Sequence, residues 1–211
     1  MIGQSLKRVV QIFIVTLMML SINGFAAADK SDVTEAMLDN GMKILIKQDH
    51  RAPVVVAQVW YRIGSSYEPD GITGVSHVLE HMMFKGTGKY PKGEFNRIIA
   101  ENGGKDNAFT GRDYTAYFQT LEKSRLAVSM ELESDRMQGM LLDEDEFAKE
   151  LNVVIEERRM RTEDKAESKV YEKFNEVAFP GHPYGRPVIG WMRDLEKLEV
   201  DDLKKWYQRY Y

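Results

Sequence analysis

Residues 74–87 read GVSHVLEHMMFKGT, and the interpretation of the whole chain starts from this stretch. The segment from Gly74 to Lys85 is predicted to form a helix, because a glycine-containing loop precedes it and Gly86 follows it as a stop signal. Thr73 or Ser76 is expected to cap the helix, since a side-chain oxygen can accept a backbone N–H of the first turn. The chemistry of the stretch then depends on which side chains share a helical face.

Two histidines and a glutamate in this stretch have the spacing H-x-x-E-H. On a helix, positions i, i+3 and i+4 share one face, so His77, Glu80 and His81 project in the same direction. Two imidazoles one turn apart can bind one Zn²⁺ through neutral nitrogens at ~2.0–2.1 Å. The neighbouring carboxylate can accept a proton from a zinc-bound water, whose pKa the metal lowers to ~7. The spacing predicts a hydrolytic zinc site; the alternative is a helix with half-buried structural histidines.

A catalytic zinc site usually has three protein ligands, so a third ligand is expected elsewhere in the chain. The sequence contains no cysteine, which leaves His, Asp or Glu. A helix predicted over residues 145–161 offers Glu150, Glu156 and Glu157. Glu150 and Glu157 lie two turns apart on one face, whereas Glu156 points about 100° away from Glu157. Spacing alone does not choose among the three, and a solvated acidic helix face is the alternative.

The composition is that of a globular protein. The 211 residues are 43% hydrophobic and 29% charged, with a formal net charge of −4. This charge gives no global basic field, and the sequence has no basic stripe with interleaved aromatic residues, so a nucleic-acid partner is not expected. The absence of cysteine excludes disulfides, thiol catalysis and thiolate metal sites. The other histidines, His50 and His182, lack ligand partners at helical spacing and are expected to be structural or solvated.

Residues 1–28 have the features of a secretory signal peptide. Lys7 and Arg8 form a positive start, an apolar run follows over residues 9–20, and Ala26 to Ala28 supply small residues for cleavage. The apolar run is shorter than the ~20 residues of a membrane span. We therefore expect export, with no stable membrane anchor after cleavage; an uncleaved N-terminal anchor is the alternative.

The remaining sequence predicts strands first and then interleaved helices. Strands are expected over 33–38 and 42–47 around an Asp-Asn-Gly turn, over 54–61 as a buried strand, and over 105–110 and 114–121 as a pair. Helices are expected over 92–102, 124–140, 143–161, 168–179 and 201–211. Leu126, Met130 and Met137 are predicted to form one apolar stripe, and Val170, Phe174 and Val177 another. Because no βαβ rhythm or glycine-rich phosphate loop is present, the predicted fold class is α+β.

Six stretches carry a resemblance to a known family. They are Leu38–Gly41, Val59–Ser65, Gly74–Thr87, Asn107–Thr110, Val153–Glu157 and His182–Gly185. In this order they resemble the N-terminal domain of the pitrilysin, insulinase and mitochondrial-processing-peptidase family of zinc metallopeptidases, whose inverted motif is H-x-x-E-H. The resemblance implies an αβ roll, with helices packed on a mixed, largely antiparallel sheet. It implies a metallopeptidase domain over residues 29–195, with 196–211 beginning the following lobe.

The resemblance also implies roles for individual residues. His77, His81 and Glu157 match the ligands of one zinc ion per chain, and Glu80 matches the general base. Glu150 matches an acidic position that supports the site from outside the ligand set.

Asn107 and Ala108 match a strand that binds the substrate backbone. By the same resemblance the protein is a zinc-dependent endopeptidase for extended or unfolded peptides, completed by a homologous second half or partner subunit and located in a bacterial periplasm. Two alternatives are a non-catalytic or partner-dependent subunit and a hydrolase that uses the same zinc-bound water on another bond.

Overall fold

The computed structural model describes residues 33–211. The predicted signal peptide, residues 1–28, lies outside the described residues. The chain divides into two compact units, one ending at Ala52 and the other running from Pro53 to Tyr211. Among the described residues, none of the helices combines the length and the apolar character that crossing a membrane requires.

The described part of the first unit is a β-hairpin. β1 (Val33–Met37) pairs antiparallel with β2 (Lys43–Lys47), and the register sets Val33 opposite Lys47. The backbone N–H of Leu38 donates to the carbonyl of Met42 across the turn, at 2.9 Å. Gly41 has φ +85°, a left-handed conformation that glycine adopts without steric cost. The hairpin predicted around the Asp-Asn-Gly sequence is therefore confirmed.

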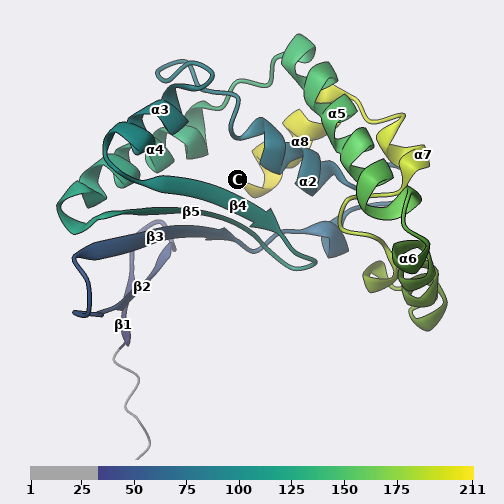
Figure 1. Cartoon of the computed structure of the whole chain (residues 1–211), viewed down its shortest axis with the longest axis horizontal. Coiled ribbons are helices and arrows are strands. Elements are labelled where there is room, and N and C mark those ends of the chain that lie inside the picture. Colours follow the sequence, from purple (N-terminus) through teal and green to yellow (C-terminus); the bar gives the residue numbers. More distant parts are fainter. Residues whose placement is uncertain (1–32) are drawn as a thin grey trace, which may run out of the picture. The chain divides into compact units, whose positions relative to one another are not determined.

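The second unit is built on a three-stranded sheet (Figure 1). β3 (Val54–Tyr61), β4 (Lys105–Thr110) and β5 (Thr115–Glu122) are ordered β3-β5-β4, with both pairs antiparallel. The strand predicted over residues 54–61 is confirmed, but the prediction that it is buried is wrong for part of its side chains. Ala57 and Tyr61 are buried, whereas Val56 and Trp60 are half exposed, because alternate side chains of a strand point to opposite faces of the sheet.

The second unit also contains α-helices. They are α2 (Val75–Met82), α3 (Glu94–Glu101), α4 (Leu126–Gly139), α5 (Glu144–Arg158), α6 (Ala166–Ala178), α7 (Met192–Leu195) and α8 (Val200–Tyr210). Shorter helical turns are η1 (Ser65–Tyr67), η2 (Lys123–Arg125), the π-helical η3 (Arg159–Glu163) and η4 (Pro183–Gly185). In Figure 1, α2, α3 and α4 lie on the same side of the sheet, and α5 packs against α2. The α+β fold class is confirmed, and the described strands pair only antiparallel.

The main core lies between α2, the sheet and α8. Val78 and Leu79 of α2 share one hydrophobic cluster with Tyr117 of β5 and with Leu203 and Trp206 of α8. Residues 196–211, predicted to begin a following lobe, thus contribute side chains to the same core as the H-x-x-E-H helix. The boundary at residue 195 stays a prediction.

The apolar stripe predicted for α4 is wrong. Leu126 is 37% and Met130 50% exposed, and of the predicted stripe Met137 packs partly buried against the main core. The buried face of the helix carries Leu132 together with Glu133 and Arg136. Helical periodicity is present, but polar side chains occupy the buried positions because they find partners inside the fold.

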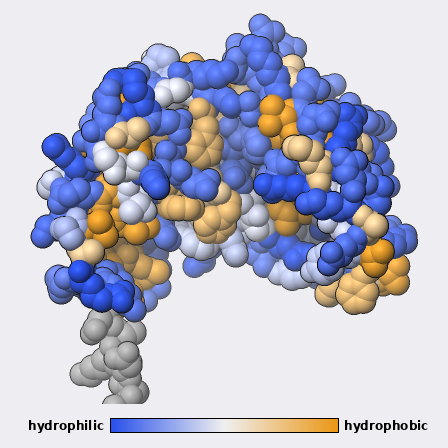
Figure 2. Space-filling view, viewed as in Figure 1, coloured by the Kyte–Doolittle hydropathy of each residue, from blue (hydrophilic) through white to orange (hydrophobic). Residues whose placement is uncertain are grey.

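The helix predicted over residues 168–179 is present as α6, but its predicted apolar face stays exposed. Val170, Phe174 and Val177 each have more than half of their surface accessible, as does Tyr171. Figure 2 shows hydrophobic surface at the place of α6 in this view.

Candidate metal centre

The N-terminus of α2 is held by a carboxylate rather than by the predicted hydroxyl cap. Glu68 accepts the backbone N–H of Gly74 at 2.7 Å and that of Ser76 at 2.8 Å. Both carboxylate oxygens are thereby used on N–H groups that the first turn leaves without partners. The prediction that Thr73 or Ser76 caps the helix is wrong, since neither side chain accepts such a bond.

A second set of contacts fixes the start of α2 against a distant loop. Thr73 Oγ1 donates to Asp194 at 2.5 Å and accepts the N–H of Trp191 at 3.0 Å. Gly74 and Gly190 both have positive φ and lie back to back, so that a Cβ on Gly190 would lie 2.7 Å from the Cα of Gly74. The loop can approach the helix this closely because both positions are glycine.

Three predicted ligands face one another between α2 and α5. His81 Nε2 lies 3.4 Å from Glu157 Oε2, and His77 Nε2 lies 3.8 Å from Glu157 Oε1. One ligand atom from each of the three residues can be chosen so that all lie within 4.8 Å of one another. The rings of His77 and His81 have centroids 4.8 Å apart, as expected for residues one turn apart on a helix face.

These donors fit a zinc ion. A tetrahedral Zn²⁺ with bonds of ~2.0–2.1 Å separates its ligand atoms by about 3.3–3.4 Å. His81 Nε2 lies at such a separation, 3.4 Å, from Glu157 Oε2, while His77 Nε2 lies 3.8 Å from the other oxygen of Glu157. Two imidazole nitrogens and one carboxylate oxygen are also ligand types of catalytic zinc sites, which leave a position open. Each side chain is mostly buried but not sealed, so solvent can reach the group.

Glu150 contacts the outer nitrogen of His81. Its Oε2 lies 3.3 Å from His81 Nδ1. A carboxylate on one imidazole nitrogen fixes the tautomer and directs the other nitrogen's lone pair, and metal-binding histidines are commonly oriented in this way. Glu156, the third candidate from spacing, points elsewhere: it pairs with Arg159 and its side chain is exposed.

Glu80 lies beside the histidines and is bonded to the sheet. Thr110 of β4 donates its hydroxyl to Glu80 Oε2. Burial raises the pKa of Glu80, while this hydrogen bond opposes the shift. Sequence reasoning missed Thr110, although it ends the stretch Asn107–Thr110, because no local spacing connects residue 110 with residue 80.

The two histidines differ in their affinity for protons. Burial, followed by the charge of His81, lowers the pKa of His77 to about 4. Burial would also lower the pKa of His81, but its hydrogen bonds to Glu157 and Glu150 raise that pKa overall. The hydrogen bond from His81 lowers the pKa of Glu157. At neutral pH His77 is therefore neutral, whereas His81 keeps its proton to a higher pH than an ordinary imidazole, and a metal ion competes with that proton.

The predicted substrate strand lies at an edge of the sheet. Asn107 pairs with Phe118 and Ala108 with Tyr117, so β4 is bonded to β5 along one side. The order β3-β5-β4 leaves the other side of β4 without a partner strand among the described residues. His182 is structural, as expected: its Nδ1 accepts the N–H of Tyr184 at 3.1 Å.

Comparisons with known proteins agree on one family. Residues 43–191 match the family model described as Insulinase (Peptidase family M16). The zinc protease PqqE of Helicobacter pylori is 35% identical over 208 residues, covering 98% of this chain and 47% of that protein. A crystal structure of a protease from Helicobacter pylori has a TM-score of 0.79 at 36% identity, covering 84% of this chain and 43% of that chain. The periplasmic protease PqqL from Escherichia coli has a TM-score of 0.78 at 25% identity, over 86% of this chain and 21% of that chain.

These matches also show how much of the relatives' length this chain represents. It spans about half the length of the curated relatives that it matches, namely 47% of the Helicobacter pylori protein.

Proposed function

The chain belongs to the insulinase family, peptidase family M16, and on that premise we propose that it is the metal-binding part of a zinc-dependent endopeptidase. Its substrates are extended or unfolded peptides, and it binds one zinc ion per chain through His77, His81 and Glu157. The observation that carries the proposal is the convergence of these three side chains from two helices, with Glu80 on the same face as the histidines.

The bound metal would supply a polarised, more acidic water molecule and a positive charge for the oxygen of the substrate carbonyl. Glu80 is the general base in this proposal, because it is the carboxylate next to both histidines that is not itself a ligand. It accepts a proton at Oε1 while Oε2 is held by Thr110. The same carboxyl group then donates the proton to the leaving amine of the cleaved peptide. Glu150 supports the reaction indirectly, by holding the ring of His81 through Nδ1.

The substrate would bind as an added strand along β4. An extended peptide can pair with the backbone of Asn107 and Ala108 by β-augmentation, a mode that recognises backbone groups more than side chains. The position of β4 at the sheet edge, together with the bond from Thr110 to Glu80, supports this placement. A peptide on this strand would have its backbone close to the general base.

The rest of the catalytic unit would come from a homologous second half or a partner subunit. The fraction of the relatives' length that this chain represents supports this proposal. The alternative is a non-catalytic or partner-dependent subunit, but the intact set of His77, Glu80, His81 and Glu157 favours catalysis. We further propose a bacterial periplasmic location, supported by the signal-like residues 1–28 and by the periplasmic relative PqqL.

A substrate assay with a matched variant tests the proposed activity. The wild-type chain, alone and together with a homologous second-half or partner chain, is incubated with an unfolded protein and a long peptide, before and after chelation. We expect cleavage that zinc restores after chelation, and a loss of about 10²–10⁴-fold in turnover in Glu80→Gln, with zinc content unchanged. Equal turnover in this variant would remove Glu80 from the mechanism. Cleavage of an ester but not of any peptide would favour the alternative of a hydrolase that acts on a bond other than the peptide bond.

A further inference from the structure

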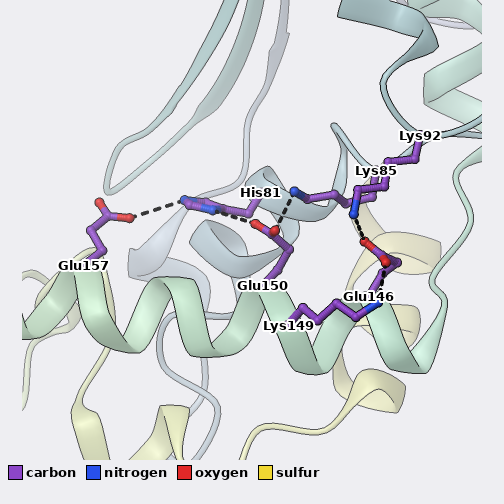
Figure 3. A network of polar contacts seen from close by, with 7 residues as sticks. All are labelled: His81, Lys85, Lys92, Glu146, Lys149, Glu150 and Glu157. Atoms are coloured by element: carbon purple, nitrogen blue, oxygen red, sulfur yellow. Dashed lines mark hydrogen bonds and ion pairs between the residues drawn. The ribbon is translucent and has the colours of Figure 1, made fainter.

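A chain of ionic contacts extends from the candidate metal centre to a lysine that follows α2 (Figure 3). Glu150 uses Oε2 on His81 Nδ1, at 3.3 Å, and Oε1 on Lys85 Nζ, at 2.5 Å. Lys85 comes four residues after His81, as His81 comes four after His77. Each oxygen of Glu150 thus has one nitrogen partner, and both partners come from the same segment.

The backbone at Lys85 is fixed on both sides. Its N–H donates to the carbonyl of Met82 at 2.9 Å, which continues the end of α2. Gly86 follows with φ +104°, and a Cβ there would lie 2.5 Å from the backbone nitrogen of Lys92. The carbonyl of Gly86 accepts the N–H of Leu141 at 3.2 Å. Lys85 therefore projects toward Glu150 from a backbone held in place by its neighbours.

A second lysine pair nearby offers a comparison of the same kind. Lys92 pairs with Glu146, which lies one turn before Glu150 on α5 and also binds Lys149 at 2.8 Å. The side chain of Lys92 is 56% exposed, whereas those of Lys85 and Glu150 are 19% and 12% exposed. Exposed ion pairs contribute little to the stability of the fold, whereas a buried carboxylate that loses its cation lowers it strongly. The Lys85 pair is also the one whose carboxylate contacts a predicted ligand.

We propose that Lys85 is a positioning residue for the zinc site, acting through Glu150 on His81. By holding Oε1 of Glu150, it keeps Oε2 on His81 Nδ1 and so keeps Nε2 of His81 directed at Glu157. This inference rests on the proposed function, since it assumes that zinc binds between these residues. Without Lys85, Glu150 lacks a partner for one buried oxygen, and the carboxylate turns away from His81.

Simple electrostatics and the positioning role predict opposite changes in zinc affinity when the charge of Lys85 is removed. Removing a positive charge near a cation site lowers repulsion and should strengthen the binding of Zn²⁺. The positioning role predicts weaker binding in the same variant, because the orientation of a ligand is lost. The sign of the change in affinity therefore separates the two accounts.

The test measures the zinc affinity of the full chain by competition with a chelating dye. In Lys85→Met we expect affinity to fall about 10–100-fold, the range found when outer partners of metal ligands are removed. Lys85→Arg, which keeps a cation at this place, should restore most of the affinity. Lys92→Met is the matched control and should bind zinc as the wild type does, because its partner Glu146 contacts none of the ligands.

A double variant shows whether Lys85 acts through Glu150. In a Glu150→Gln background, Lys85→Met should cause little further loss of affinity, whereas independent effects would add. Circular dichroism of each variant confirms folding, and if Lys85→Met does not fold, Lys85→Gln takes its place. Equal or tighter zinc binding by the Lys85 variant, or additive losses, would overturn the inference while leaving the zinc site in place. A wild-type chain that binds no zinc would instead overturn the proposed function itself.

Discussion

Two groups of charged side chains in this molecule are built in opposite ways. Between α4 and β5, Arg136 donates from Nε to Glu133 at 3.1 Å, and Gln119 donates to the same carboxylate. Ser129 in turn donates to Gln119 at 2.7 Å. All four side chains are buried, and the guanidinium of Arg136 lies 4.4 Å from the ring centre of Phe95.

Between α2 and α5 the charged groups leave room for a ligand. His77 Nε2 and Glu157 Oε1 are 3.8 Å apart, too far for a hydrogen bond, and the buried Nδ1 of His77 has no hydrogen-bond partner. The α4–β5 group pairs its opposite charges with each other, although Nη1 of Arg136 has no hydrogen-bond partner among the described residues, and the pairing serves stability. The α2–α5 group brings possible ligand atoms within 4.8 Å of one another, and in our proposal it holds a cation. Glu157 Oε1 lies 2.7 Å from Arg161 Nη1, so unpaired atoms alone do not distinguish the two groups. The comparison teaches that buried charge by itself does not identify a functional site, whereas metal-ligand types from two helices that face one another do.

The largest effect on stability is expected from the α4–β5 group. Arg136→Met leaves the buried carboxylate of Glu133 without its cation, and breaking a buried pair in this way costs about 3–5 kcal/mol of unfolding free energy. Arg97→Met is the control, because Arg97 forms an i,i+3 pair with Glu94 on an exposed surface and its loss should change the unfolding free energy little. Urea unfolding of the zinc-free chain measures both values. Similar losses in the two variants would contradict the distinction between them.

Zinc should raise the unfolding free energy of the chain through the α2–α5 group, and this rise should not depend on the α4–β5 group. A ligand that binds only the folded state at 100 times its Kd adds about 2.7 kcal/mol of unfolding free energy. Thermal unfolding with and without zinc should therefore show a large rise for the wild type and little or none for Glu157→Gln. The Arg136→Met chain, where it folds, should keep the full zinc-dependent rise. A rise of equal size in Glu157→Gln would remove Glu157 from the ligand set.

The contact between Thr110 and Glu80 should matter for turnover rather than for metal binding. Thr110→Val keeps the shape of the side chain but removes the hydroxyl that donates to Glu80 Oε2. Losing one hydrogen bond to a charged group, ~1.5 kcal/mol or more, corresponds to about a tenfold or larger fall in kcat. Thr110→Ser should retain most of the activity. A variant lacking the hydroxyl that turned over as fast as Thr110→Ser would show that the contact does not position the base.

The last effect depends on pH and concerns Glu68, which belongs to neither group but anchors α2. Burial raises the pKa of Glu68 from an ordinary value of 4.5 to about 7, against the two backbone N–H groups that lower it. Between these pH values the folded state keeps a proton that the unfolded state has lost. Stability contributed by this residue is therefore present below pH 4.5 and lost as pH rises toward 7, by at most ~1.4 kcal/mol per pH unit. Glu68→Gln should lack this slope in zinc-free unfolding experiments, and an identical pH profile would refute it.

Local periodicity predicted the parts of the site that lie on one helix. His77, Glu80 and His81 are three and four residues apart, so a helix alone brings them to one face, and the structure has that helix. The third predicted ligand could not be chosen in this way. Spacing left Glu150, Glu156 and Glu157 open, and the packing of α5 against α2 determines that Glu157 faces both histidines while Glu156 faces away.

The predictions that failed or were missed concern residues whose environment is set by side chains distant in the sequence. Leu126 and Met130 follow the helical period as well as the buried face does, and sequence alone could not show that Arg136 would be buried between aromatic rings. Glu68 lies six residues before the first N–H that it accepts, outside any local capping pattern. Lys85 is in the quoted stretch, but its role depends on a glutamate of another helix.

The most direct test of the account counts zinc atoms in purified chains. Wild-type protein and Glu80→Gln, loaded with zinc and freed of excess metal, should each contain one zinc per chain by atomic spectroscopy. His77→Ala, His81→Ala and Glu157→Ala should each contain far less, although they remain folded by circular dichroism. A wild-type chain without bound zinc, or a Glu157→Ala chain with as much zinc as the wild type, would contradict the proposed site.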